Sequence, residues 1–279
     1  HIEQTSRVAT ELSNFLGSSL AATLPAENRL FAALALPADL ISGPFLEAWW
    51  KVNRLPEEEE LVLLLQGSTN PKLRTLVHRL FSNPKKAPGL MRTTLRLRSR
   101  LKLDQIEDVL TTALGNLSKI NGQEDLLVEM VTAFKLRQLK DPVVRILANP
   151  NHSHSLRANA LQALRRIGAG ADPVILNFLK SDDTPKGLRL AALAAVGASG
   201  DLKNAPLVIA GIKNLSILEQ AEIVDDLSRS VDGATLLLGG VVQNSLPSAF
   251  LSPSALEKMA ELLPDNSIMQ KLWAKEAES

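Results

Sequence analysis

The chain has 279 residues, of which 45% are hydrophobic and 22% charged, with a formal net charge of +1 and no cysteine. This composition is typical of a folded chain with an ample core. The absence of cysteine excludes disulfides, thiolate catalysis and Cys-ligated zinc or iron–sulfur sites. Since no apolar run approaches the roughly 20 residues that span a bilayer, we expect no membrane insertion. The balanced charge excludes a global field that attracts nucleic acid or membranes.

Apolar residues recur at steps of three and four along most of the chain, which predicts helices nearly throughout. In chain order we expect them over 4–23, 27–36, 45–55, 57–66, 72–81, 105–117, 124–139, 141–148, 155–167, 172–179, 188–196, 205–212, 216–230, 232–243, 253–263 and 265–275. Asp104, Asp141 and Asp172 are expected to cap the helices that follow them. The segment 95–103 alternates leucine with polar residues and leaves a strand open as an alternative.

Two stretches nearly repeat each other at a fixed offset of 32 positions, namely 155–168 and 187–200. A second match, of Asp141-Pro142-Val143-Val144 with Asp172-Pro173-Val174-Ile175, has an offset of 31. Interleaved matches at nearly one period indicate a repeated helical hairpin, which must stack on neighbours because it cannot bury its apolar stripe alone. We therefore expect an all-α chain, a right-handed superhelix of stacked antiparallel helix pairs.

These hairpins resemble HEAT-type α-solenoid repeats, with Asp-Pro starts, second helices of the form x-Leu-Arg-x-x-Ala-Leu and a closing glycine. The matching residues are Asp172, Pro173, Leu188, Arg189, Ala192, Leu193 and Gly197, and in the previous unit Asp141, Pro142, Leu156, Arg157, Ala160, Leu161 and Gly168. The resemblance implies a single domain over 1–279, with irregular helix pairs in 1–103, regular repeats in 104–200 and irregular helices in 201–279.

The order of elements is also similar to the helical-repeat region of large multidomain proteins from planctomycete-type bacteria. Those proteins carry a sugar-dehydrogenase-like propeller, HEAT repeats and a terminal cytochrome c domain. The features that carry the likeness are Phe45-Leu46-Glu47-Ala48-Trp49-Trp50, Leu188-Arg189-Leu190-Ala191-Ala192-Leu193 and Gly233-Ala234-Thr235-Leu236-Leu237. The likeness implies a fragment of a longer protein that acts as a periplasmic spacer; otherwise we expect a cytoplasmic chain. A Cys-x-x-Cys-His haem motif is missing, so we expect no cofactor here.

The charge distribution is uneven. The segment 71–103 holds ten basic residues and no acid, so it carries +10 and the remaining chain −9. Such a strip is able to bind phosphates or an acidic partner, or else it is a solvated face paired with Glu57–Glu60 on a neighbouring helix. The candidate binding residues are Lys72, Arg74, Arg79, Arg92, Arg96, Arg98, Arg100 and Lys102. Only Phe81 in the strip is aromatic, which disfavours a single-strand nucleic-acid site.

Two further features are candidates for contacts. Trp49 and Trp50 could anchor a partner, although one of them is expected to pack in the core. His152 and His154 alternate on a loop, but two ligands make an incomplete site, so we expect no metal.

We therefore predict a scaffold or spacer without enzymatic activity, which binds a protein partner or the flanking domains of its parent chain. The alternative is an anion- or nucleic-acid-binding module that uses the strip 71–103. An enzyme is the third hypothesis, and the sequence offers it no catalytic triad and no glycine-rich phosphate loop.

Overall fold

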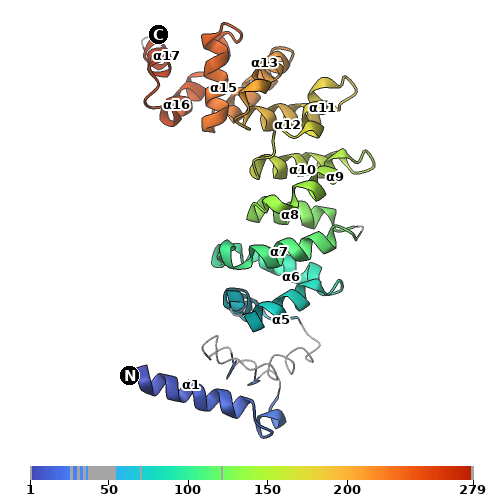
Figure 1. Cartoon of the computed structure of the whole chain (residues 1–279). Helices are drawn as coiled ribbons and strands as arrows, with labels where there is room; N and C mark the ends of the chain where they lie inside the picture. Colours follow the sequence, from blue (N-terminus) through green and yellow to red (C-terminus); the bar gives the residue numbers. More distant parts are fainter. Residues whose placement is uncertain are drawn as a thin grey trace. The chain divides into compact units, whose positions relative to one another are not determined.

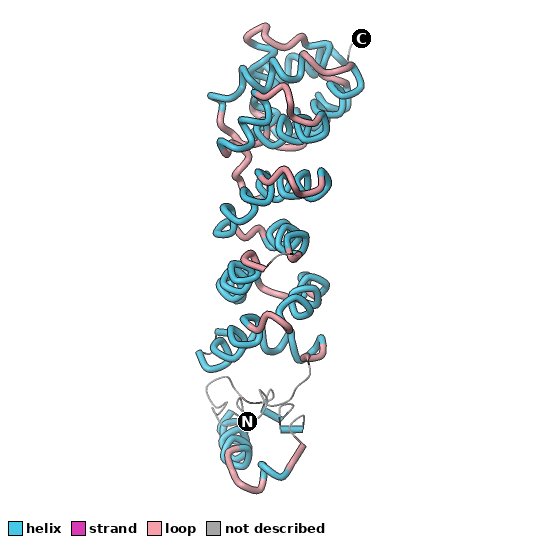
Figure 2. The backbone as a smooth tube through the Cα atoms, turned by 90° about the vertical axis from the view of Figure 1, so that its right-hand side faces the viewer, coloured by secondary structure: helices cyan, strands magenta, loops and turns pink. Residues whose placement is uncertain are grey.

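The structure is a computed structural model that describes residues 2–25, 28–29, 32–33, 36, 55–69, 71–120 and 122–277. These residues form helices and connecting turns and contain no strand, so the all-α prediction is confirmed (Figure 2). The chain divides into two compact units, His1–Phe134 and Lys135–Ser279. The boundary lies inside the range 104–200 that the sequence assigns to regular repeats, and the assignment of 1–279 to a single domain stays a prediction.

The first unit contains packed pairs of helices. Its described helices are α1 (Ile2–Leu16), α4 (Glu58–Gln66), α5 (Pro71–Ser82), α6 (Ala87–Arg96), α7 (Leu103–Leu117) and α8 (Glu124–Phe134), with 3-10 turns η1 (Ala21–Thr23), η2 (Gly67–Thr69) and η3 (Arg98–Arg100). Helix α5 packs on α6 and on α7, whereas α6 packs on α8 (Figure 1). Phe81, Met91, Leu110 and Met130 are buried from four different helices and form the core between the pairs.

The second unit repeats this arrangement over more helices. They are α9 (Lys140–Ala148), α10 (His154–Arg166), α11 (Pro173–Lys180), α12 (Lys186–Gly197), α13 (Ala205–Lys213), α14 (Ile217–Leu227), α15 (Val231–Val242), α16 (Pro253–Leu262) and α17 (Ser267–Ala277), with turns η4 (Arg137–Leu139), η5 (Leu202–Asn204) and η6 (Ser248–Phe250). Helices α9 and α10 form one pair and α11 and α12 the next, while α10, α12 and α14 contact one another in sequence.

The repeat register deduced from the sequence is reproduced in the burial pattern of the second unit. Leu161 of α10 and Leu193 of α12 are each 1% exposed, and Ala160 and Ala192 beside them are fully buried. A Cβ on Gly170, in the turn after α10, would lie 2.1 Å from the carbonyl oxygen of Ala195 in α12. The absence of a side chain there lets the turn pack directly on the next pair.

One of the two glycines predicted to close a helical hairpin does not end a helix. Gly168 and Gly200 have φ values of 79° and 74°, the left-handed conformation that favours glycine after a helix. Gly197 instead lies within α12, where a Cβ would meet the Leu227 side chain at 2.7 Å. The counterpart of Gly168 is therefore Gly200, and Gly197 is a packing residue of the second pair.

The two Asp-Pro motifs also differ. The Asp172 carboxylate accepts a hydrogen bond from the Val174 N–H at 3.0 Å and caps α11, as predicted. The prediction for Asp141 is wrong, because α9 follows directly on η4 and begins at Lys140, with Leu139 at the N-cap. The Nζ atom of Lys140, the first residue of α9, lies 2.8 Å from the Asp172 carboxylate, so the two form an ion pair.

Three further helix boundaries differ from the sequence prediction. The expected helix 124–139 ends at Phe134, because Lys135 turns left-handed with φ 53° and the next residue, Leu136, is fully buried. The helix expected from Gln105 begins at Leu103 with Lys102 at its N-cap, which places Asp104 in the first turn. The helix expected over 4–23 ends at Leu16, before Gly17.

The ambiguous segment 95–103 does not form a strand. Helix α6 continues to Arg96, and η3 covers Arg98–Arg100. The alternation of leucine and basic residues there reflects one buried leucine, Leu97, between exposed arginines.

Candidate functional site

The basic segment 71–103 is spread over α5, α6 and the connection from α6 to α7. Arg74 and Arg79 lie on α5, Arg92 and Arg96 on α6, and Arg98, Arg100 and Lys102 follow. Arg92 and Arg96 thus lie on α6 and the three that follow lie on the connection to α7, while Arg74 and Arg79 belong to α5, which packs on both α6 and α7. The backbone of Lys72 lies in the first turn of α5, and its side chain lies outside the described residues.

Three of the arginines are paired with carboxylates. Arg96 contacts Glu58 at 2.9 Å, and Arg100 donates two hydrogen bonds to Glu59 at 2.8 and 2.6 Å. The Arg100 guanidinium holds the pKa of Glu59 below its ordinary value. The glutamates at the start of α4 therefore neutralise part of the strip, as the solvated-face reading expects.

Arg74 pairs with Asp108 on α7, and the Nε2 atom of His78 lies 3.4 Å from the same carboxylate. Burial raises the pKa of Asp108, but the Arg74 guanidinium lowers it more, so this pKa lies below its ordinary value. This cluster ties α5 to α7, so Arg74 is engaged within the protein.

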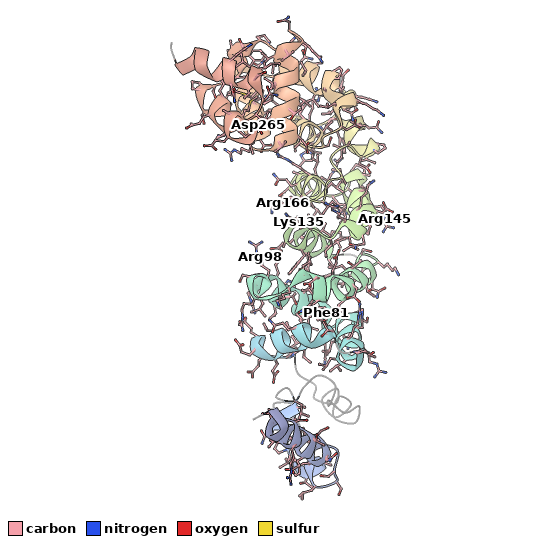
Figure 3. All side chains as sticks on the ribbon, turned by 60° about the vertical axis from the view of Figure 1, so that its left-hand side comes forward. Phe81, Arg98, Lys135, Arg145, Arg166 and Asp265 are labelled. Atoms are coloured by element: carbon pink, nitrogen blue, oxygen red, sulfur yellow. The ribbon has the colours of Figure 1, made fainter. Side chains whose placement is uncertain are left out.

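The other described cations of the segment carry no ion pair to a described residue. Arg92 and Arg98 are exposed, and the Arg98 side chain extends away from its helices in Figure 3. The remaining members are Arg79, Lys85, Lys86 and Lys102. Phe81 is 1% exposed, so it offers no surface on which a base could stack. The arrangement suits contact with an extended anion, without aromatic readout.

The other sequence candidates contribute less. Trp49 and Trp50 lie outside the described residues. His152 has its Nε2 atom 3.3 Å from the Nδ2 atom of Asn149, within the loop that joins α9 to α10. Across the described ranges, no three His, Asp or Glu side chains gather as metal ligands would.

An acidic face on α14 is occupied by basic side chains of its neighbours. Asp226 accepts from Arg165 of α10 at 2.5 Å, and Asp225 pairs with Lys258 of α16 and with Arg229 at 2.6 Å. Lys258 and then Arg229 hold the pKa of Asp225 below its ordinary value. These aspartates therefore join helices to one another.

Two features of the second unit were missed at the sequence level. Ile217 and Leu218, the first residues of α14, are 86% and 72% exposed. Helices α13 and α15 also line a cavity of about 600 Å³ whose walls are mostly apolar. The adjacent Gly239 and Gly240 within an apolar helix were the available signal for the cavity, because helix interiors disfavour glycine.

Comparisons with known proteins found no match. No family model, no curated protein and no solved structure matches this chain. Within the described residues, none of the helices has the length and apolarity needed to cross a bilayer.

Proposed function

We propose that the chain is a HEAT-like α-solenoid that acts as a scaffold without enzymatic activity and binds a protein partner. The support is the successive contact of α10, α12 and α14 together with the equivalent burial of Leu161 and Leu193. Stacked pairs of this kind present long rows of helix ends and faces to a partner. The right-handed superhelix and the periplasmic spacer role in a larger redox protein belong to the same proposal.

One observation carries the protein-binding role, namely the exposure of Ile217 and Leu218 side by side at the start of α14. Two large apolar side chains that stay exposed at successive positions are candidates for contact with a partner. The pair is held in place, because the Glu219 carboxylate accepts hydrogen bonds from the Ser216 N–H at 3.2 Å and from its hydroxyl at 2.5 Å. Lys186 of α12 contacts the other carboxylate oxygen at 2.7 Å. The apolar pair is thus presented on a fixed turn.

The test is quantitative capture of proteins from an extract of the source organism. The wild-type chain is compared with Ile217→Ser/Leu218→Ser and with a matched control, Val8→Ser, which changes an exposed apolar residue of α1. We expect a defined partner retained by the wild type and by the control and depleted by the double variant. A set of captured proteins that the double variant leaves unchanged contradicts this site.

The second candidate is binding of a polyanion by the strip 71–103. It is favoured by Arg92 and Arg98, which are exposed and form no ion pair with a described residue, beside Arg96 and Arg100. Binding to duplex DNA, single-stranded DNA and heparin is measured at low and moderate salt. Tight binding to DNA over heparin that weakens steeply with salt, and that Arg92→Glu/Arg98→Glu removes, supports it. Equal weak binding to every polyanion contradicts it.

A further inference from the structure

The cavity between α13 and α15 is open to solvent on one side, and its walls are mostly apolar. Its apolar lining from α13 consists of Ala205, Pro206, Ile209 and Ala210, and α15 contributes Leu236. Leu202, in the turn before α13, is 56% exposed at the edge. A volume of about 600 Å³ lies within the range of sites that hold small molecules. The space therefore suits an apolar body of small-molecule size.

Two adjacent glycines of α15 shape this cavity in different ways. A Cβ on Gly240 would lie 2.8 Å from the Ile209 Cδ1 atom, so Gly240 lets α15 approach α13. A Cβ on Gly239 would meet nothing within 4 Å, although Gly239 lines the same cavity. Glycine in a helix interior costs about 1 kcal/mol relative to alanine. Close packing against Ile209 explains why residue 240 is a glycine. At position 239 the glycine instead leaves open space in the cavity that a side chain would occupy.

The polar groups of the lining are few and favour an anionic head. Lys213, the last residue of α13, is the charged residue among the lining side chains, and it has no acidic partner among the described residues. Thr235 and Ser245 donate their hydroxyl hydrogens to the carbonyls of Val231 at 2.7 Å and Gly240 at 3.0 Å. An ammonium group beside an apolar cavity, without a carboxylate to neutralise it, complements a ligand that carries one negative charge.

We propose that this cavity binds a medium-chain aliphatic carboxylate, with its chain between α13 and α15 and its carboxylate at Lys213. The site is independent of the protein-binding surface at Ile217 and Leu218. The carboxylate accepts hydrogen bonds from the Lys213 ammonium and from the Gln243 amide, whose donor hydrogens, unlike the threonine and serine hydroxyls of the lining, are not used in a hydrogen bond to a described residue.

The test is calorimetric titration of the full chain with hexanoate, octanoate and decanoate, and with 1-octanol as the uncharged probe. Each added methylene should tighten binding about fourfold, because that is the effect of burying one CH₂ group. Octanoate should bind more tightly than 1-octanol. Lys213→Gln should reduce the affinity for octanoate about fivefold and leave that for 1-octanol unchanged.

A filling variant tests the position of the site. Gly239→Leu should abolish binding, and the matched control Gly115→Leu should retain it, since Gly115 also lies in a helix with nothing within 4 Å of an added Cβ. If Gly239→Leu does not fold, Ala210→Leu fills the cavity from the facing helix. Octanoate binding that survives both filling variants overturns the proposal. So does failure of the carboxylates to bind, or equal affinity for 1-octanol.

Discussion

Arg157 and Arg189 hold the same position in consecutive helix pairs, and each donates to backbone carbonyls at or just beyond the C-terminal end of the preceding helix. The Nε atom of Arg157 donates to the Leu147 carbonyl at 2.9 Å, and Nη2 of Arg189 donates to the carbonyls of Ser181 and Asp182, each at 2.9 Å. The last carbonyls of a helix have no partner within it. Arg157 satisfies one such carbonyl of α9, and Arg189 binds the turn that follows α11, so each arginine joins the two helices of its pair.

Replacing Arg157 by methionine should lower the free energy of unfolding by about 1–3 kcal/mol, because the buried Leu147 carbonyl loses its charged donor. The contact of the guanidinium with the Phe178 ring, 5.4 Å from its centroid, is lost as well. Urea denaturation measures the effect, with Arg166→Met, an exposed change on the same helix, as the control. Identical midpoints for both variants would show that the carbonyl does not need this arginine.

Truncating Leu161 or Leu193 to alanine should each cost about 2–5 kcal/mol of stability, as expected when a fully packed leucine leaves a cavity. The two side chains are buried at equivalent positions of α10 and α12. Chemical denaturation is the measurement, and Gln162→Ala, an exposed neighbour on α10, is the control. A negligible loss at both leucines rejects the repeat register.

Glycines with different surroundings should respond differently to alanine. Gly168→Ala should cost about 1–2 kcal/mol, because its φ of 79° is unfavourable for any residue with a Cβ. Gly115→Ala should stabilise the chain by up to about 1 kcal/mol, since Gly115 lies within α7 with open space around it. Thermal unfolding followed by circular dichroism compares them. A shift of the same sign in both variants would contradict the backbone assignment.

The Glu219 carboxylate should make stability depend on pH in the acid range. Its contact with Lys186, and then with Ser216, lowers its pKa to about 2. Because the pKa is lower in the folded chain, the stabilisation is complete above the ordinary pKa and is lost as the pH falls toward about 2. The difference in urea midpoint between wild type and Glu219→Gln should therefore shrink between about pH 5 and pH 2. Glu222→Gln, on the exposed side of α14, is the matched control.

The sequence predicted the helices wherever local pattern and tertiary packing agree. It placed α12 and α14 within a few residues because their apolar spacing and their ends both follow from neighbouring residues. It extended α8 by five residues, because the periodic pattern continues to Leu139 and the burial of Leu136 depends on contacts distant in sequence. Asp141 and Asp172 look alike as Asp-Pro motifs, and only the preceding turn decides which one caps a helix.

The candidate surfaces were predictable to a smaller extent. The pairing of Arg96 and Arg100 with Glu58 and Glu59 follows from the charge pattern, once the helices containing them are neighbours. The cavity beside Lys213 depends on how far α13 and α15 separate, which no local pattern encodes.

The ion pair between Arg165 and Asp226 joins α10 to α14, two layers apart in the order α10, α12, α14. In a stack where each helix pair contacts only its two neighbours, the unfolding free energy of a pair depends on its own stability and on its interfaces with those neighbours. A bond that bypasses the middle layer adds a term that neither adjoining interface contains. Because both side chains are partly exposed, this direct coupling of α10 to α14 contributes about 1 kcal/mol or less.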